Sequence, residues 1–179
     1  MKNNILIFLP GVLFILLFAC SGNKETNAGN NTTKVPEVLK NDTLLNIYEY
    51  QVIDTFENGY PMTIRFFDKS DLNNPLFEKK YYQNGHIFMQ GPYKNNKRDG
   101  KWIAWYENGV IWSTGNYKNG LRNGQSISYY ENGSLRYSKN YELNIAEGVG
   151  KFYTPDGTLA AEIMYSGDTI MWKKEYNNE

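Results

Sequence analysis

The sequence is short of the side chains that most often carry catalysis or bind metal ions. Its 179 residues include one cysteine, Cys20, and one histidine, His86. Basic and acidic side chains balance, with 19 of each, so the chain has no charge excess of the kind that marks nucleic-acid-binding proteins. We therefore expect no disulfide framework and no nucleic-acid partner.

Long apolar runs are also scarce. One such run lies at the start of the chain. Residues 5–19 are all non-polar and follow Lys2 closely. This run of 15 residues is shorter than the roughly 20 needed to cross the hydrocarbon core of a membrane as a helix. A short apolar stretch behind a positive charge is typical of a secretory signal peptide, which we assign to residues 1–19. A permanent transmembrane span is the less favoured alternative.

The apolar run ends in Leu17-Phe18-Ala19-Cys20, which resembles the lipobox of bacterial lipoproteins. The resemblance implies diacylglyceryl addition to Cys20, cleavage before it and N-acylation of the new terminus. Several acyl chains would hold the protein stably at a membrane, whereas a single chain binds reversibly. A lipidated Cys20 leaves no free thiol, so we expect neither a cysteine nucleophile nor a cysteine metal site.

Residues 20–43 are predicted to be the lipidated cysteine followed by a flexible tether. They contain almost no large apolar side chain before Val35 and cannot bury enough surface to offset the entropy lost on ordering. Lipoproteins exported to the cell surface in some bacteria carry acidic residues directly after the cysteine, and Ser21-Gly22-Asn23-Lys24 lacks them. We expect a lipid-anchored protein of the cell envelope, with the periplasmic face of the outer membrane favoured and surface exposure left open.

Internal repetition dominates the rest of the sequence. Residues 81–104, 105–128, 129–152 and 153–176 align without a gap, at a period of 24 residues. In every copy the first residue is aromatic, the fourth is Asn or Asp, the fifth is Gly, the seventh is Ile or Leu and the thirteenth is Tyr. Residues 44–80 form a degenerate earlier hairpin copy, with a two-residue insertion expected within 68–74, and residues 177–179 are a short tail.

The fourth and fifth positions of each repeat predict a tight turn. Asn-Gly or Asp-Gly between alternating apolar stretches favours a two-residue type I′ hairpin, in which both central residues need φ > 0. The residues concerned are Asn84, Gly85, Asn108, Gly109, Asn132, Gly133, Asp156 and Gly157. A second, looser turn is expected at 94–100, 118–124 and 143–148, so each repeat holds two strands.

Half-repeats of 12 residues leave no room for a helix of ordinary length. With one more hairpin from residues 47–67, about eleven strands follow one another along the chain. Open sheets rarely exceed roughly ten strands unless they curl. We therefore predict an all-β fold, an elongated antiparallel meander of repeated hairpins that forms a solenoid-like twisted sheet.

The patterns Tyr-Tyr-Glu-Asn-Gly-x-Leu and Tyr-Lys-Asn-Gly resemble bacterial MORN-variant repeats, of the type found in proteins labelled YwqK-family antitoxins. The resemblance covers residues 81–176 well and 47–80 poorly. It implies a repeat-built fold with a role in scaffolding, membrane association or partner binding. The antitoxin label implies neutralising a toxin by direct contact.

None of the candidate catalytic or ligand-binding motifs in the sequence is complete. His86 stands where the other repeats have Val110, Ser134 and Thr158, so it is an ordinary variable strand residue. Residues 148–151 resemble the end of a phosphate loop but lack its first glycine, and 68–79 lack the turn glycine and final glutamate of a calcium loop. Carboxylates beside the turns, such as Glu107 and Glu131, have no second carboxylate as a catalytic partner. We expect no catalytic residue, no metal and no cofactor.

Two surface features are candidates for binding. Aromatic side chains make up 16% of the sequence, and they could form a row of rings on one face, with core packing as the alternative; the candidates are Trp102, Tyr106, Trp112 and Tyr130. The turns also carry a basic set: Lys94, Lys97, Arg98 and Lys101, continued one repeat later by Lys118 and Arg122. Stacked turns would align these charges for anionic lipid or a polyanion, against the alternative of a solvated rim.

These observations favour a non-catalytic envelope lipoprotein that is held at the membrane by its lipid and binds or scaffolds a protein partner. An antitoxin-like protein is the second hypothesis, and an envelope hydrolase is the third.

Overall fold

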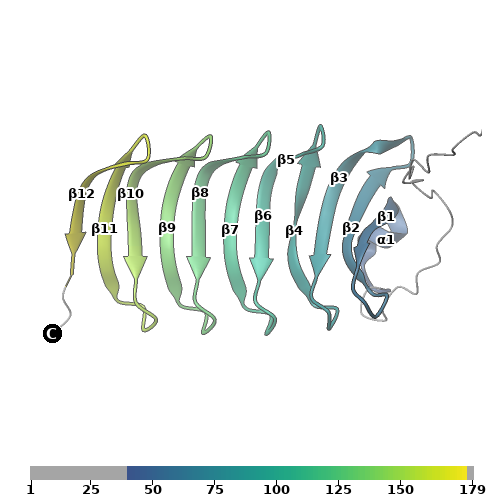
Figure 1. The fold of residues 1–179 in the computed structure, drawn as a ribbon, viewed down its shortest axis with the longest axis horizontal. Coiled ribbons are helices and arrows are strands. Elements are labelled where there is room, and N and C mark those ends of the chain that lie inside the picture. The colour runs from purple at the N-terminus through teal and green to yellow at the C-terminus, as the bar shows by residue number, and fades with distance from the viewer. Residues whose placement is uncertain (1–39, 177–179) are drawn as a thin grey trace, which may run out of the picture. The chain divides into compact units, whose positions relative to one another are not determined.

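A computed structural model of the protein describes residues 40–176, so the predicted signal peptide, Cys20, most of the tether and the tail at 177–179 lie outside it. One short helix, α1 (Thr43–Ile47), precedes a row of antiparallel strands (Figure 1). The strands are β1 (Glu49–Thr55), β2 (Pro61–Asp68), β3 (Asp71–Tyr81), β4 (Ile87–Lys94), β5 (Lys97–Arg98), β6 (Gly100–Trp105), β7 (Ile111–Lys118), β8 (Leu121–Tyr129), β9 (Leu135–Glu142), β10 (Ile145–Tyr153), β11 (Leu159–Ser166) and β12 (Thr169–Glu175).

Each strand pairs with its neighbours in sequence. The order across the sheet is β1-β2-β3-β4-β6-β7-β8-β9-β10-β11-β12, and the two-residue strand β5 pairs with β4 off this path. The pairings are antiparallel throughout, as the ribbon shows (Figure 1). The predicted all-β meander of hairpins is therefore confirmed.

The first hairpins carry the extra residues that the repeat alignment predicted. Between the pairs Phe66↔Phe77 and Asp68↔Asp71, β2 advances by two residues and β3 by six. At the equivalent place in the next copies, between Gly115↔Ser126 and Tyr117↔Arg122, the two strands advance by two and four. The excess of two residues lies on β3, between Asp71 and Phe77, and it is absorbed as a bulge because the pairing resumes on both sides.

The helix α1 is an element that the sequence did not predict. It is one turn long, and the Asp42 carboxylate caps its start by accepting from the backbone N–H of Leu44 at 3.1 Å. The apolar side chains of this segment pack on the best-buried part of the described sheet. Leu44, Leu45 and Tyr48 lie against a cluster of Ile64, Phe66 and Tyr81.

Beyond β3 the described sheet is a single layer, and few apolar side chains are buried in it. Trp102, Ala104 and Ala146 are the buried apolar residues of β4–β12. A single layer leaves both faces of the sheet accessible over most of the repeats. Among residues 40–176, no helix has the length and hydrophobicity needed to cross a membrane.

The Asn-Gly loops are not the two-residue type I′ turns that the sequence predicted. In the second repeat, Tyr106 N–H donates to the Val110 carbonyl at 2.8 Å and Gly109 N–H donates to the Tyr106 carbonyl at 2.9 Å. Gly109 has φ of 86°, whereas Asn108 is not among the residues with positive φ. This is a three-residue loop, a type I turn closed by a glycine in the left-handed region. The carboxamide oxygen of Asn108 accepts a hydrogen bond from Val110 N–H at 3.0 Å. Asn108 therefore stabilises the loop through its side chain and does not adopt the left-handed conformation that the sequence predicted.

The type I′ turns lie at the opposite end of the strands, where a looser connection was predicted. Asn119 and Gly120 have φ of 52° and 87° between the paired residues Lys118 and Leu121. The same two-residue turn occurs at Asn95–Asn96, Leu143–Asn144 and Gly167–Asp168. The prediction was wrong because the glycine that follows, such as Gly124, is part of a bulge inside the strand pair and not of the turn.

Hydrogen bonds between successive repeats fix the spacing of the array. The second residue of three repeats is a tyrosine whose hydroxyl donates to the carbonyl of the first residue of the next repeat. The pairs are Tyr82–Trp105 at 2.8 Å, Tyr106–Tyr129 at 2.9 Å and Tyr130–Tyr153 at 2.7 Å. Each such bond is worth about 0.5–1.5 kcal/mol, and their regular recurrence sets the same register for every copy.

Candidate functional site

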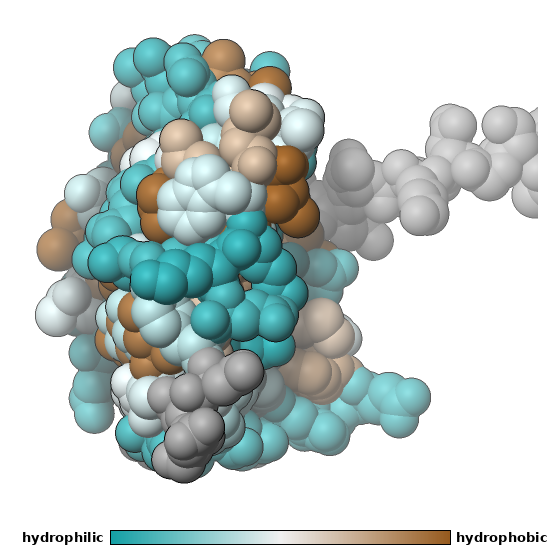
Figure 2. Space-filling view, turned by 90° about the vertical axis from the view of Figure 1, so that its left-hand side faces the viewer, coloured by the Kyte–Doolittle hydropathy of each residue, from teal (hydrophilic) through white to brown (hydrophobic). Residues whose placement is uncertain are grey.

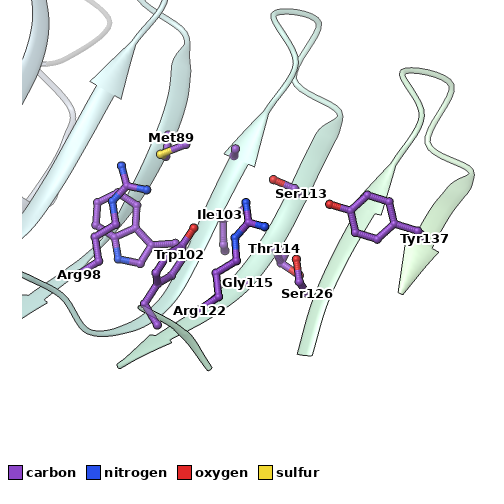
Figure 3. Close-up of a pocket in the computed structure, with 12 residues that line it drawn as sticks. Met89, Arg98, Trp102, Ile103, Ser113, Thr114, Gly115, Arg122, Ser126 and Tyr137 are labelled. Atoms are coloured by element: carbon purple, nitrogen blue, oxygen red, sulfur yellow. The ribbon is translucent and has the colours of Figure 1, made fainter. Parts of the chain in front are cut away.

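A groove crosses β6, β7 and β8 on one face of the sheet. Residues paired across antiparallel strands share a face, and the pairs Trp102↔Gly115 and Gly115↔Ser126 therefore define this side, which we call the groove face. The residues that line the groove are Met89, Arg98, Trp102, Ile103, Ala104, Ser113, Thr114, Gly115, Tyr117, Arg122, Ser126 and Tyr137. Figure 3 shows Arg98 and Trp102 at one end and Tyr137 at the other, with Arg122, Ser113 and Ser126 between them.

Small side chains form the floor of the groove. Ala104 pairs with Ser113, and Gly115 pairs with Ser126, so four small residues from three strands are neighbours. Ala104 is 2% exposed and Ser126 is 8% exposed, which places them below the level of the surrounding rings. The depression follows from the second repeat, which has small residues at positions filled by Met89 or Trp102 in the first.

Trp102 closes one end of the groove and is itself part of the packing. It is 3% exposed, and its indole N–H donates to the carbonyl of Pro92 at 3.0 Å. Its ring lies directly over Gly91, where a Cβ atom would come within 2.4 Å of the indole, so this position accepts glycine alone. Tyr93 and Tyr117 meet the ring edge-on, at centroid distances of 5.5 and 6.3 Å. The sequence left open whether Trp102 belongs to an exposed row of rings or to the core, and its burial places it in the core.

Two arginines flank the same cluster. The Arg98 guanidinium lies 4.1 Å from the Trp102 ring centroid and 5.6 Å from that of Tyr117. Arg122 lies 5.3 Å from the ring centroid of Tyr141, and its hydrogen bond to the Tyr117 side chain is the main cause that raises the pKa of Arg122. Arg98 and Arg122 therefore flank the same tyrosine, Tyr117.

Neither arginine is neutralised by a carboxylate within residues 40–176. Neither of them takes part in the ion pairs Arg65–Glu78, Lys79–Asp42, Lys151–Glu162 and Lys173–Glu175. The guanidiniums of Arg98 and Arg122 thus combine aromatic contacts with N–H donors that form no ion pair. Such donors suit an incoming carboxylate or phosphate.

The other predicted aromatic residues lie away from the groove, near the three-residue loops. Trp112 is 36% exposed and stacks on Phe88 at 6.2 Å with an interplanar angle of 21°. Tyr106 contacts Trp112 at 6.2 Å, and Tyr130 lies under the guanidinium of Arg136 at 5.7 Å. The single row of rings expected from the sequence is therefore divided between two places.

The predicted basic set is divided as well. Lys94, Lys97, Lys101 and Lys118 are exposed, and three of them flank the type I′ turns. The turns of neighbouring repeats do stack, because a Cβ on Gly120 would lie 3.7 Å from the Cβ of Lys97. The two arginines, in contrast, lie against aromatic rings of the groove face.

The predicted turn residues all lie in the three-residue loops, and their side chains join one loop to the next. The carboxamide of Asn84 donates to the Glu107 carboxylate at 2.9 Å, that of Asn108 to the Glu131 carbonyl at 3.4 Å, and that of Asn132 to the Pro155 carbonyl at 2.8 Å. In the described part of the chain, no group of three or more His, Cys, Asp or Glu side chains is placed to hold a metal ion. His86 contacts the backbone carbonyl of Glu107 through Nδ1 at 2.9 Å.

Sequence reasoning missed the groove, although a signal for it was present. In the second repeat the residues at positions nine, eleven, twenty-two and twenty-four are all small, and each of the other repeats has a large side chain at one or more of these positions. The four residues are Ser113, Gly115, Ser126 and Ser128. Which residue of β8 lies opposite which residue of β7 depends on the bulge between Gly115 and Tyr117, which is visible only in the structure.

The described residues define a class of protein, an open antiparallel array of hairpin repeats. Four segments match the family model of the MORN repeat variant, at residues 78–95, 98–119, 122–143 and 146–166. These segments of the chain are accordingly MORN-type repeats. Repeats of this kind commonly serve as protein-binding or membrane-binding modules. A comparison with curated proteins gives no match.

Proposed function

We propose that the protein is a lipid-anchored envelope protein whose repeats bind or scaffold a partner protein, and that it has no catalytic activity of its own. The observation that carries this proposal is the single-layer array with accessible faces. Large apolar side chains are exposed along it, among them Ile111, Trp112, Leu121 and Val149 at 36–38%. Exposed apolar and aromatic side chains, repeated along a surface, are typical of interaction sites.

The rigidity of the array supports the same proposal. Tyrosine and asparagine side chains tie each repeat to the next at the loop end, and stacked type I′ turns do so at the other end. Side chains held at fixed positions lose less conformational entropy when a partner binds. A surface of this kind favours stable association.

The proposed anchor rests on the sequence. The apolar run at residues 5–19 and the lipobox-like Leu17-Phe18-Ala19-Cys20 support cleavage and lipidation at Cys20. The predicted tether, whose last residues Asp42 and Thr43 belong to the start of α1, would then separate the repeats from the membrane surface. Under this proposal the partner is a protein of the envelope that lies within reach of the tether.

Affinity capture with the full lipidated chain from detergent-solubilised envelopes tests the proposal. We expect a partner protein to be recovered in constant ratio to the chain, and a variant with disrupted loops, Gly109→Val combined with Gly133→Val, to recover less of it. A captured toxin whose activity the chain blocks would favour antitoxin-like neutralisation. Hydrolysis of an envelope component that is lost on replacing one carboxylate would overturn the non-catalytic assignment.

A further inference from the structure

The strongest unexplained feature of the described residues is the positive charge of the groove. Of the residues that line it, Arg98 and Arg122 are basic and none is acidic. The lysines of these strands alternate with groove-face residues and therefore lie on the opposite face; they are Lys94, Lys97, Lys101 and Lys118. Charge of one sign concentrated beside a groove attracts a partner of the opposite sign.

We propose that the groove binds an acidic, extended peptide segment of the partner protein, with its carboxylates placed on Arg98 and Arg122. This inference rests on the proposed binding function and names the surface and chemistry that would carry it. Each guanidinium presents a planar fork of N–H donors, which matches a carboxylate in two parallel hydrogen bonds. The aromatic contacts with Trp102, Tyr117 and Tyr141 orient these forks without occupying them with a carboxylate.

The two arginines flank the same tyrosine. The Arg98 guanidinium is 5.6 Å from the ring centroid of Tyr117, and Arg122 is the cross-strand partner of Tyr117, so both lie beside one side chain of the groove. Side chains at i and i+2 of an extended peptide point the same way, roughly 6.6 Å apart. An Asp or Glu at each of these positions would reach both arginines from a single strand-like segment.

The shape of the groove favours a peptide over a membrane surface. Its floor, from Ala104 to Ser126, is buried below the rings, so only a narrow chain can reach it. Ser113, Ser126 and Tyr137 line the groove with hydroxyl groups, which can donate to and accept from a peptide backbone. The exposed lysines of the turns, Lys94 and Lys118, lie off the groove face and are the cations available to a flat layer of anionic headgroups.

A binding experiment with a defined acidic probe tests the inference. Fluorescein-labelled octaglutamate is titrated against the full chain in neutral detergent, and anisotropy reports binding. We expect saturable binding that falls at least 10-fold in the Arg98→Gln/Arg122→Gln double variant, because charge-assisted hydrogen bonds to both guanidiniums are lost. The Arg98→Lys/Arg122→Lys variant keeps the positive charge but loses the planar fork of donors. Its affinity for octaglutamate should lie between that of the wild type and that of the Gln double variant.

The matched control removes the same charge outside the groove. Lys94→Gln/Lys118→Gln should change the octaglutamate affinity by less than about 3-fold, because exposed single charges contribute little. Thermal unfolding of every variant separates loss of binding from loss of fold, since Arg98 also packs on Trp102.

Three outcomes would overturn the inference. The first is absence of octaglutamate binding by a folded wild-type chain, and the second is equal loss of affinity in the groove and turn variants. The third is binding to phosphatidylglycerol vesicles that depends on the two arginines while octaglutamate binding does not, which would assign the surface to a membrane. If affinity capture recovers the same partner from wild type and from the Arg98/Arg122 double variant, the binding function stands and the groove assignment fails.

Discussion

Gly109 shows how one residue determines the geometry of a repeat. Its φ of 86° lies in the region that L-residues with a side chain rarely adopt, and its N–H closes the turn on the carbonyl of Tyr106. A Cβ atom added there would meet nothing within 4 Å. Any cost of substitution therefore comes from backbone strain and not from a clash with neighbours.

Replacing Gly109 by Val should lower the free energy of unfolding by about 1–3 kcal/mol, because a β-branched residue is strained at positive φ. Gly109→Asn is the matched control, and it should cost less because asparagine tolerates the left-handed region. Denaturant unfolding of the two variants and the wild type measures the difference. Equal stability of Gly109→Val and wild type would show that the loop adopts another conformation.

At the scale of elements, the edge strand β12 differs from the strands inside the array. All seven of its residues are exposed, with Ile170 at 56% and Met171 at 61%. Its second half is charged, and Lys173 forms an ion pair with Glu175. Seen from this end of the sheet, hydrophobic surface lies beside a band of hydrophilic side chains (Figure 2). Charge on an edge strand discourages the addition of further strands.

Deleting residues 166–179 from the unlipidated chain 21–179 should make it oligomerise or aggregate. The deletion removes β12 and opens the backbone of β11 from Leu159 to Tyr165, a segment with a single charged residue, Glu162. An apolar strand with unpaired N–H and C=O groups is a template for pairing with another chain. Size-exclusion chromatography and light scattering at equal concentration compare the two chains. A truncated chain that stays folded and monomeric would show that β12 is dispensable as a cap.

At the scale of the whole molecule, the proposed function gives the repeats and the predicted anchor separate tasks. The repeats from β3 to β12 form one continuous sheet without a transmembrane helix among the described residues. The apolar run before Cys20 is the segment of the sequence with enough hydrophobicity for membrane attachment. Attachment and partner binding should therefore be separable by mutation.

The variant Cys20→Ser should lose acylation and shift out of the detergent phase in phase partitioning, because the lipid is the proposed anchor. Metabolic labelling with a fatty acid provides the second readout, and it should be lost together with membrane retention. Unchanged retention of an unlabelled Cys20→Ser protein would instead show that residues 5–19 remain as a membrane span. Octaglutamate binding by this variant should equal that of the wild type.

The sequence by itself determined the run of about eleven strands on the main path of the sheet, their order and their antiparallel pairing, but not the two-residue strand β5. These follow from local signals: turn residues recur every 12 residues or so, and the segments between them are too short for helices. A hairpin is closed by its own turn, so no distant part of the chain is needed to specify which strands pair. The loops at Asn84 to Gly157 were located correctly for the same reason, although their turn type was not.

The tertiary structure decided what each face of the sheet presents. Side-chain direction alternates along a strand, so a single bulge moves every later residue to the other face, and bulges occur in most hairpins here. Periodicity therefore could not separate Trp102, buried over Gly91, from Trp112, exposed near the loops. Nor could it bring Arg98 and Arg122 to the same tyrosine, because that contact depends on register between strands of different repeats. Local turn residues determine which strands form each hairpin. The register between neighbouring hairpins determines which side chains each face of the sheet presents.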